Sequence, residues 1–123
     1  MQSQSIHLSI PESKTEKMGG KEVTYYIIKV DYDGKKWDVK RRYNDFDDLK
    51  KDLAKNNGGI PPMPGKTLWK ISGPEFVEQR RVGLEKFLRK LLERQDMFGN
   101  DLFLQFLKVS LNINSSQYIL ILV

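Results

Sequence analysis

The sequence predicts an α+β fold, in which a three-stranded antiparallel meander precedes a helical subdomain of three or more helices with a proline-rich loop. Apolar and polar residues alternate through the first third of the chain, which is the period of a half-buried strand. The Asp-Gly pair at 33–34 separates two such runs, as in a tight hairpin. Beyond residue 44 the apolar period changes to that of an α-helix.

The strands are predicted from alternation and from proline and glycine positions. The first covers residues 5–10 and ends at Pro11, and a polar loop is expected over residues 11–21. The second covers residues 22–32 and the third residues 35–42. The residues expected to face the core on these two strands are Tyr26, Ile28, Val30, Tyr32, Trp37 and Val39. The other face of the third strand carries Lys36, Asp38, Lys40 and Arg42.

The first helix is predicted to start near Asp45 with Asn44 as its cap, and to stop at the Asn-Asn-Gly-Gly run at 56–59. Its apolar residues at helical spacing are Phe46, Leu49 and Leu53. The proline-rich segment at 61–64 follows. We therefore expect a helix that packs one face on the sheet and then leads into a stiff loop.

A long second helix is predicted from Ser72, which forms a capping-box pattern with Glu75, to about Arg94. A short last helix is predicted over residues 101–108. The apolar stripe of the long helix consists of Phe76, Val77, Leu84, Phe87, Leu88, Leu91 and Leu92.

The 123 residues are enough for one domain, expected at 1–108, followed by a tail at 109–123 whose structure the sequence does not predict. There is no cysteine, which excludes disulfides and fits a reducing compartment. The single histidine, His7, is expected on the outer face of a strand. Without a metal-ligand cluster or an activated nucleophile, no enzyme, metal site or cofactor is expected.

The net charge of +5 favours an anionic partner. Nucleic acid, an acidic protein and the anionic cytoplasmic leaflet of a membrane all fit this charge, and so does a merely solvated basic surface. Composition alone leaves these open.

The Gly-Lys-Thr at 65–67 ends like a nucleotide-binding phosphate loop, but the pattern fails. The first glycine of that loop would fall at position 60, which is Ile60. The prolines before Gly65 also lack the N–H groups with which such a loop holds phosphate. Lys66 therefore needs another explanation.

Arg80 lies inside the apolar stripe of the long helix, where an arginine without a partner is costly. An acidic side chain, backbone carbonyls or an anionic ligand would satisfy it, and so would a side chain that extends to solvent. Arg42 and Tyr43 suit a ligand with a phosphate and a flat apolar side, although Tyr43 in the core beside a solvated strand end is an alternative. Folding of the proline segment over the long helix would bring Arg42, Lys66 and Arg80 together.

Three segments, in their order and spacing, carry a family resemblance. They are RRYNDF at 41–46, PPMPGK at 61–66 and FVEQRR at 76–81, which runs into LEKFL at 84–88. Over roughly residues 5–108 the chain resembles the phox-homology (PX) domain, a phosphoinositide-binding module common in sorting nexins.

The resemblance implies a role for each of four headgroup-binding residues. Arg42 matches the arginine that grips the 3-phosphate, and Tyr43 matches the aromatic wall against the inositol ring. Lys66 matches the lysine at the 1-phosphate, and Arg80 matches the arginine that bonds the 4- and 5-hydroxyls. The implied ligand is phosphatidylinositol 3-phosphate. Arg41 and Arg81 are expected to be structural or to contribute general electrostatics.

The resemblance also implies a cytoplasmic protein that is peripheral on endosomal or vacuolar membranes, acts in trafficking and sorting, and has other trafficking proteins as further partners. Apolar residues in or after the proline loop are expected to insert at the membrane while lysines meet anionic lipid. They are Met63, Leu68, Trp69 and Ile71. Packing of this group under the loop is the alternative.

Two other functions compete. The P-x-x-P segment at 61–64 is of the kind that SH3 domains dock, which would make the chain a protein-interaction module without strong lipid specificity. Basic charge and aromatic residues also occur in nucleic-acid-binding proteins, but no recognition motif is present, so nucleic acid is not an expected partner.

Overall fold

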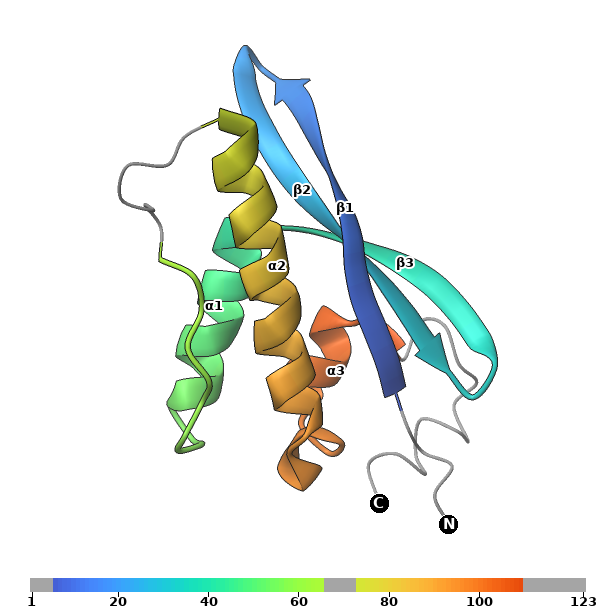
Figure 1. Ribbon diagram of the computed structural model, residues 1–123. Helices are drawn as coiled ribbons and strands as arrows, with labels where there is room; N and C mark the ends of the chain where they lie inside the picture. Colours follow the sequence, from blue (N-terminus) through green and yellow to red (C-terminus); the bar gives the residue numbers. More distant parts are fainter. Residues whose placement is uncertain (1–5, 66–72, 110–123) are drawn as a thin grey trace.

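The computed structural model describes residues 6–65 and 73–109 and confirms the α+β class. Three antiparallel strands in the order β1–β2–β3 form the sheet, and the helices cover one of its faces (Figure 1). The strands are β1 (Ile6–Met18), β2 (Lys21–Tyr32) and β3 (Lys35–Arg42). The helices are α1 (Tyr43–Ala54), α2 (Gly73–Leu92) and α3 (Asp101–Phe106), with a 3-10 turn, Gln95–Met97, between the last two.

The prediction for the first strand is wrong at its C-terminal end. The strand does not stop at Pro11, and the predicted loop at 11–21 is mostly strand. The register shifts between Ser9 and Glu12, and pairing with β2 then continues to Met18. An irregularity of this kind accommodates a proline because the missing N–H is not needed there. The true turn is Gly19 and Gly20, whose positive φ angles of 58° and 83° suit a two-residue hairpin.

Side chains of α2 satisfy the backbone at this irregularity. Glu85 Oε1 accepts a hydrogen bond from the Ile10 N–H at 2.6 Å, and Arg81 Nη1 donates to the Ile10 carbonyl. Arg81 is held in turn by an ion pair with Glu78. Because Ile10 is fully buried, these bonds replace water for both of its backbone groups. They fix α2 across β1, and they favour the structural one of the two roles expected for Arg81.

The start of α1 differs from the prediction. The helix begins at Tyr43, directly after β3, so Asn44 lies in its first turn and is not the cap. Asp45 Oδ2 accepts a hydrogen bond from the Arg42 N–H at 2.9 Å, which satisfies a donor at the helix entrance. An acidic side chain three residues into a helix can close the entrance in this way without a Ser, Thr or Asn cap. Arg42 and Tyr43 therefore occupy the junction between strand and helix.

The helix ends differ from the prediction by about two residues, which is the usual uncertainty. The long helix α2 stops at Leu92 instead of Arg94, and α3 stops at Phe106 instead of Lys108. The stop predicted for α1 is confirmed, since the Asn57 side chain donates to the Leu53 carbonyl just beyond the last turn. The predicted cap Ser72 lies outside the described residues.

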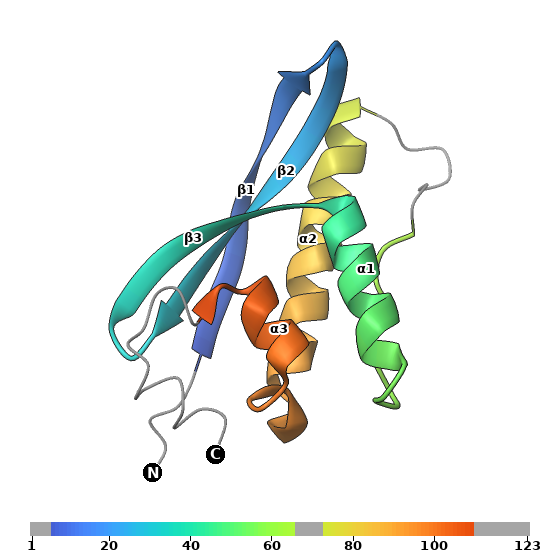
Figure 2. The same ribbon diagram turned by 180° about the vertical axis from the view of Figure 1, so that it is seen from behind.

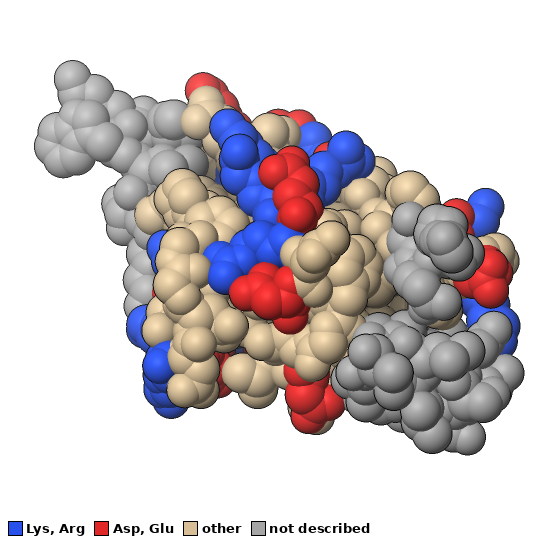
Figure 3. Space-filling view, turned by 90° about the horizontal axis from the view of Figure 1, so that it is seen from below, with Lys and Arg blue, Asp and Glu red and all other residues tan. Residues whose placement is uncertain are grey.

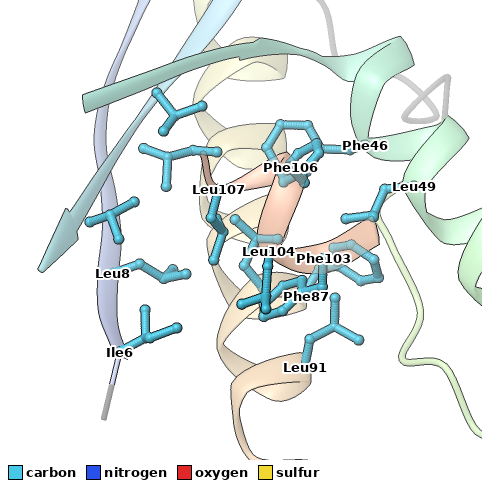
Figure 4. Close-up of a cluster of buried hydrophobic side chains, with 14 of the residues drawn as sticks. Ile6, Leu8, Phe46, Leu49, Phe87, Leu91, Phe103, Leu104, Phe106 and Leu107 are labelled. Atoms are coloured by element: carbon cyan, nitrogen blue, oxygen red, sulfur yellow. The ribbon is translucent and has the colours of Figure 1, made fainter. Parts of the chain in front are cut away.

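The core lies between the sheet and the helices (Figure 4). Every residue predicted to face the core on β2 is buried, as are the three apolar residues of α1. The Phe46 and Phe106 rings meet edge to face at 5.0 Å, which joins α1 to α3. Trp37 Nε1 donates to the Leu107 carbonyl at 2.8 Å, and Arg41 donates to the Phe106 carbonyl, so α3 is tied to β3 as well. Of the two roles expected for Arg41, structural or general electrostatic, these bonds favour the structural one.

Candidate functional site

A pocket of about 400 Å³ lies where β2, the β3–α1 junction and the N-terminal half of α2 meet. Figure 2 shows β3 leading into α1 below the raised end of the β1–β2 hairpin, with α2 alongside. This volume falls within the range of small-ligand sites. The lining consists of Glu22, Val23, Thr24, Tyr26, Arg42, Tyr43, Asn44 and Arg80. Three of the four residues predicted to bind a headgroup, Arg42, Tyr43 and Arg80, thus line one pocket.

Arg80 is held between two aromatic rings. Its guanidinium carbon lies 4.0 Å from the centroid of the Tyr43 ring and 4.4 Å from that of Phe76. Its Nη2 also donates a hydrogen bond to the Gly65 carbonyl at 3.4 Å. A planar guanidinium stacks on rings through its faces and donates N–H groups from its edge. The carbonyl partner was among the predicted alternatives, whereas the aromatic sandwich was not.

Tyr43 connects the pocket to the proline segment. Its hydroxyl donates to the Pro64 carbonyl at 2.8 Å. The Pro64 ring in turn packs on Gly83 of α2, where a Cβ atom would come within 2.9 Å of the proline Cγ. The described part of the segment, 61–65, therefore does fold against α2 and ends beside Arg80, as the sequence suggested. Lys66, the next residue, lies outside the described residues.

Tyr26 forms the floor of the pocket. It is almost fully buried, and burial raises the pKa of its phenol, while the nearby charge of Arg80 and a side-chain hydrogen bond with it act in the opposite direction. Burial likewise raises the pKa of Tyr43, again opposed by the charge of Arg80. Both phenols therefore stay neutral near pH 7 and place a polar hydroxyl beside a fixed cation.

Arg42 stands at the edge of the pocket. Arg42 is exposed to solvent and lines the pocket. The hydrogen bond from its backbone N–H to Asp45 fixes the backbone at this position. Together with Arg80, Arg42 gives the pocket one exposed cation and one half-buried cation held between two rings. Such a pair suits an anion with several oxygens, because each guanidinium can donate two parallel hydrogen bonds.

Two residues that shape the site, Tyr26 and Phe76, are predicted from the sequence to pack only in the core. Tyr26 was expected to pack in the sheet and Phe76 in the apolar stripe of α2. Phe76 is only half-buried and stacks on Arg80 four residues later, one helical turn away. The i, i+4 spacing of an aromatic residue and an arginine was the available signal.

The groups expected to insert into a membrane are only partly described. Met63 is half-buried and packs against the core, so its insertion stays a prediction. Leu68, Trp69 and Ile71 lie outside the described residues. Pro61 is buried and Pro64 packs on α2, so the prolines of the P-x-x-P segment already contact their own domain. This packing disfavours the SH3-docking alternative, which needs those rings exposed.

Comparison with known proteins identifies the family. The family model of the PX domain matches residues 30–110, and the chain belongs to the PX domain family. Sorting nexin-11 of Bos taurus is 38% identical over 77 residues, which are 61% of this chain and 28% of that protein. Sorting nexin 2B of Arabidopsis thaliana is 38% identical over 92 residues, or 68% of this chain and 16% of that protein. The chain thus spans less than a third of the length of either relative.

Solved structures agree with the fold. The designed CISK-PX domain superposes with a TM-score of 0.73 at 29% identity, over 81% of this chain and 96% of that one. The mouse SNX19 PX domain with bound sulphate gives 0.62 at 25% identity, over 86% and 98% of the two chains. Family membership supports a role in phosphoinositide binding and membrane targeting.

Relatives also include the serine/threonine-protein kinase Sgk3 of Rattus norvegicus, 30% identical over 95 residues, of which this chain covers 19%. That the present chain is not an enzyme stays a prediction. Within residues 6–65 and 73–109, no helix combines the length and apolar character needed to cross a bilayer.

Proposed function

We propose that this chain binds phosphatidylinositol 3-phosphate and recruits its protein to endosomal or vacuolar membranes, in trafficking and sorting. The observation that carries the proposal is the convergence of Arg42 and the Tyr43–Arg80 stack on one pocket. Two chain segments far apart in sequence, the β3–α1 junction and α2, supply these groups, and no packing requirement of the core explains why two arginines should meet there. The sulphate bound by the SNX19 PX domain is consistent with an anion site in this fold.

Each residue has a distinct role in the proposal. Arg42 at the rim grips the 3-phosphate, and Arg80, fixed at the centre, bonds the 4- and 5-hydroxyls. Tyr43 is the aromatic wall for the inositol ring. Lys66 binds the 1-phosphate, which is supported by its place in the chain directly after Gly65, whose carbonyl accepts from Arg80.

Membrane contact adds a second, weaker contribution. The proposal places Met63, Leu68, Trp69 and Ile71 at the interface, where apolar side chains beside lysines gain both burial and attraction to anionic lipid. A basic residue near such a surface contributes about 1 kcal/mol. Headgroup binding and shallow insertion together give reversible, peripheral attachment. The other trafficking proteins that the resemblance implies would meet the chain on that membrane.

Substitution of Arg42 tests the site. Arg42→Ala removes charge-assisted hydrogen bonds worth about 1.5–3 kcal/mol, so the affinity for vesicles with phosphatidylinositol 3-phosphate should fall by roughly tenfold or more. The control Lys55→Ala removes one charge from an exposed side chain just after α1 and should change binding little. Circular dichroism should show that both variants stay folded. Undiminished vesicle binding by folded Arg42→Ala protein would refute the assignment.

A further inference from the structure

Glu22 brings a carboxylate into the lining of the same pocket. Side chains two residues apart on a strand point to the same face, so Glu22, Thr24 and Tyr26 form one row along β2. Tyr26 is buried at the inner end of this row beside Arg80, and Glu22 is exposed at its outer end. The row leads from the Arg80 stack to the mouth of the pocket, and its last member is acidic.

The fold does not use this carboxylate elsewhere. β3 pairs with β2 only from Tyr25 onward, so Glu22 belongs to the two-stranded end of the hairpin that rises past the β3–α1 junction (Figure 2). Its cross-strand neighbour is Lys17, which is exposed. Within the described ranges no ion pair holds the Glu22 side chain. Its negative charge therefore acts on whatever enters the pocket.

The charges of the lining match a ligand with one phosphomonoester. Among the described lining residues, Arg42 and Arg80 are cationic and Glu22 is anionic. These formal charges sum to +1, whereas one phosphomonoester alone carries about −1.5 to −2 at neutral pH. A second such group at the 4- or 5-position would meet Arg80 alone among the cations of this described lining, and it would also approach the Glu22 carboxylate. Like charges close together at a protein surface repel more strongly than they do in bulk water.

We propose that Glu22 is a specificity-determining residue, which disfavours inositol headgroups that carry more than one phosphomonoester. The inference rests on the proposed function, since it requires the headgroup to enter this pocket. It assigns selectivity to repulsion at the hairpin as well as to attraction by the arginines, which is how many specific sites reject close analogues.

The test compares Glu22→Gln with the wild-type chain on phosphatidylcholine vesicles. The vesicles contain phosphatidylinositol 3-phosphate, the 3,4-bisphosphate or the 3,5-bisphosphate at equal mole fraction and fixed salt. Removal of the charge should raise the affinity for a bisphosphate relative to the monophosphate by about tenfold, or ~1.4 kcal/mol. Glu22→Lys should shift the ratio further in the same direction.

Glu93→Gln is the matched control, because it makes the same change in net charge at an exposed residue just beyond the C-terminal end of α2. It should leave the ratio of affinities unchanged. An unchanged ratio in folded Glu22→Gln protein, or an equal gain for all three lipids in both variants, would overturn the inference alone. Failure of the wild-type chain to bind any of the three vesicles would instead overturn the proposed function, and this inference with it.

Discussion

Arg80 is positioned by contacts that depend on its planar guanidinium group, which a lysine lacks. The rings of Tyr43 and Phe76 cover its two faces at 4.0 and 4.4 Å, and the Gly65 carbonyl accepts from its edge. A half-buried guanidinium beside two rings is stabilised by the ring quadrupoles, by about 0.5–1 kcal/mol at exposed sites and more where water is excluded. These contacts hold the guanidinium in place at the edge of the pocket that it lines.

Arg80→Lys should therefore weaken binding although it keeps the charge. A lysine ammonium cannot stack between two rings or donate in a planar fork, so we expect a loss of about tenfold in affinity for phosphatidylinositol 3-phosphate vesicles. The measurement is vesicle co-sedimentation, with Arg89→Lys as the control on the exposed part of the same helix. Equal affinities for wild type and Arg80→Lys would show that binding depends on the charge at position 80 and not on the guanidinium group.

At the scale of elements, the close approach of the proline segment to α2 sets the shape of the site. Gly83 allows this approach because it has no Cβ, and Tyr43 holds the segment from the other side through the Pro64 carbonyl. The helix thus accepts a residue of poor helix propensity in exchange for a contact that places Gly65 beside Arg80.

Gly83→Ala should destabilise the domain by about 1 kcal/mol. Overpacking against Pro64 costs roughly 1–3 kcal/mol, which exceeds the gain of about 1 kcal/mol in helix propensity. Urea denaturation measures the change, and vesicle binding should weaken with it because the proline segment shifts. Gly58→Ala is the control, since nothing lies within 4 Å of a Cβ there. A Gly83→Ala protein at least as stable as wild type would mean that the proline segment moves away from α2 without a cost in stability.

At the scale of the whole molecule, the net charge of +5 does not make every face of the domain basic. Figure 3 views the end of the domain where the helices α1 and α2 finish, and basic and acidic side chains are interspersed there. Ion pairs such as Arg94 with Asp96 and Lys55 with Asp52 belong to this part of the fold. The site lies toward the other end of α2, and we expect its two arginines to favour that end for contact with an anionic surface.

Salt should separate general attraction from headgroup binding. Raising NaCl from about 0.1 M to about 0.5 M shortens the range of charge interactions by roughly half and should largely remove binding to vesicles that contain only phosphatidylserine. Binding to vesicles with phosphatidylinositol 3-phosphate should fall much less, because ion pairs within a pocket are screened less than exposed ones. Parallel loss on both vesicles would argue that the domain recognises surface charge and no particular headgroup.

Much of this arrangement was predictable because local rules decide it. Alternation placed Tyr26, Ile28 and Val30 on the buried face of β2, and helical spacing placed Phe46 and Leu53 in the core. The first strand was predicted too short, because Pro11 usually ends a strand. The side chains that rescue its backbone, Glu85 and Arg81, come from a helix more than seventy residues away, and no local pattern reveals such a bond.

By itself, the sequence determined the fold class and the order of the elements, since periodicity and turn chemistry are local properties. Its motifs also named the candidate residues of the proposed headgroup site. Only the tertiary structure decided that Arg80 is sandwiched by Tyr43 and Phe76, that the proline segment docks on Gly83, and that Glu22 shares the pocket. These facts depend on which distant surfaces meet when the helices close over the sheet. Contacts between distant segments are set by packing of the whole chain and leave no periodic signal in the sequence.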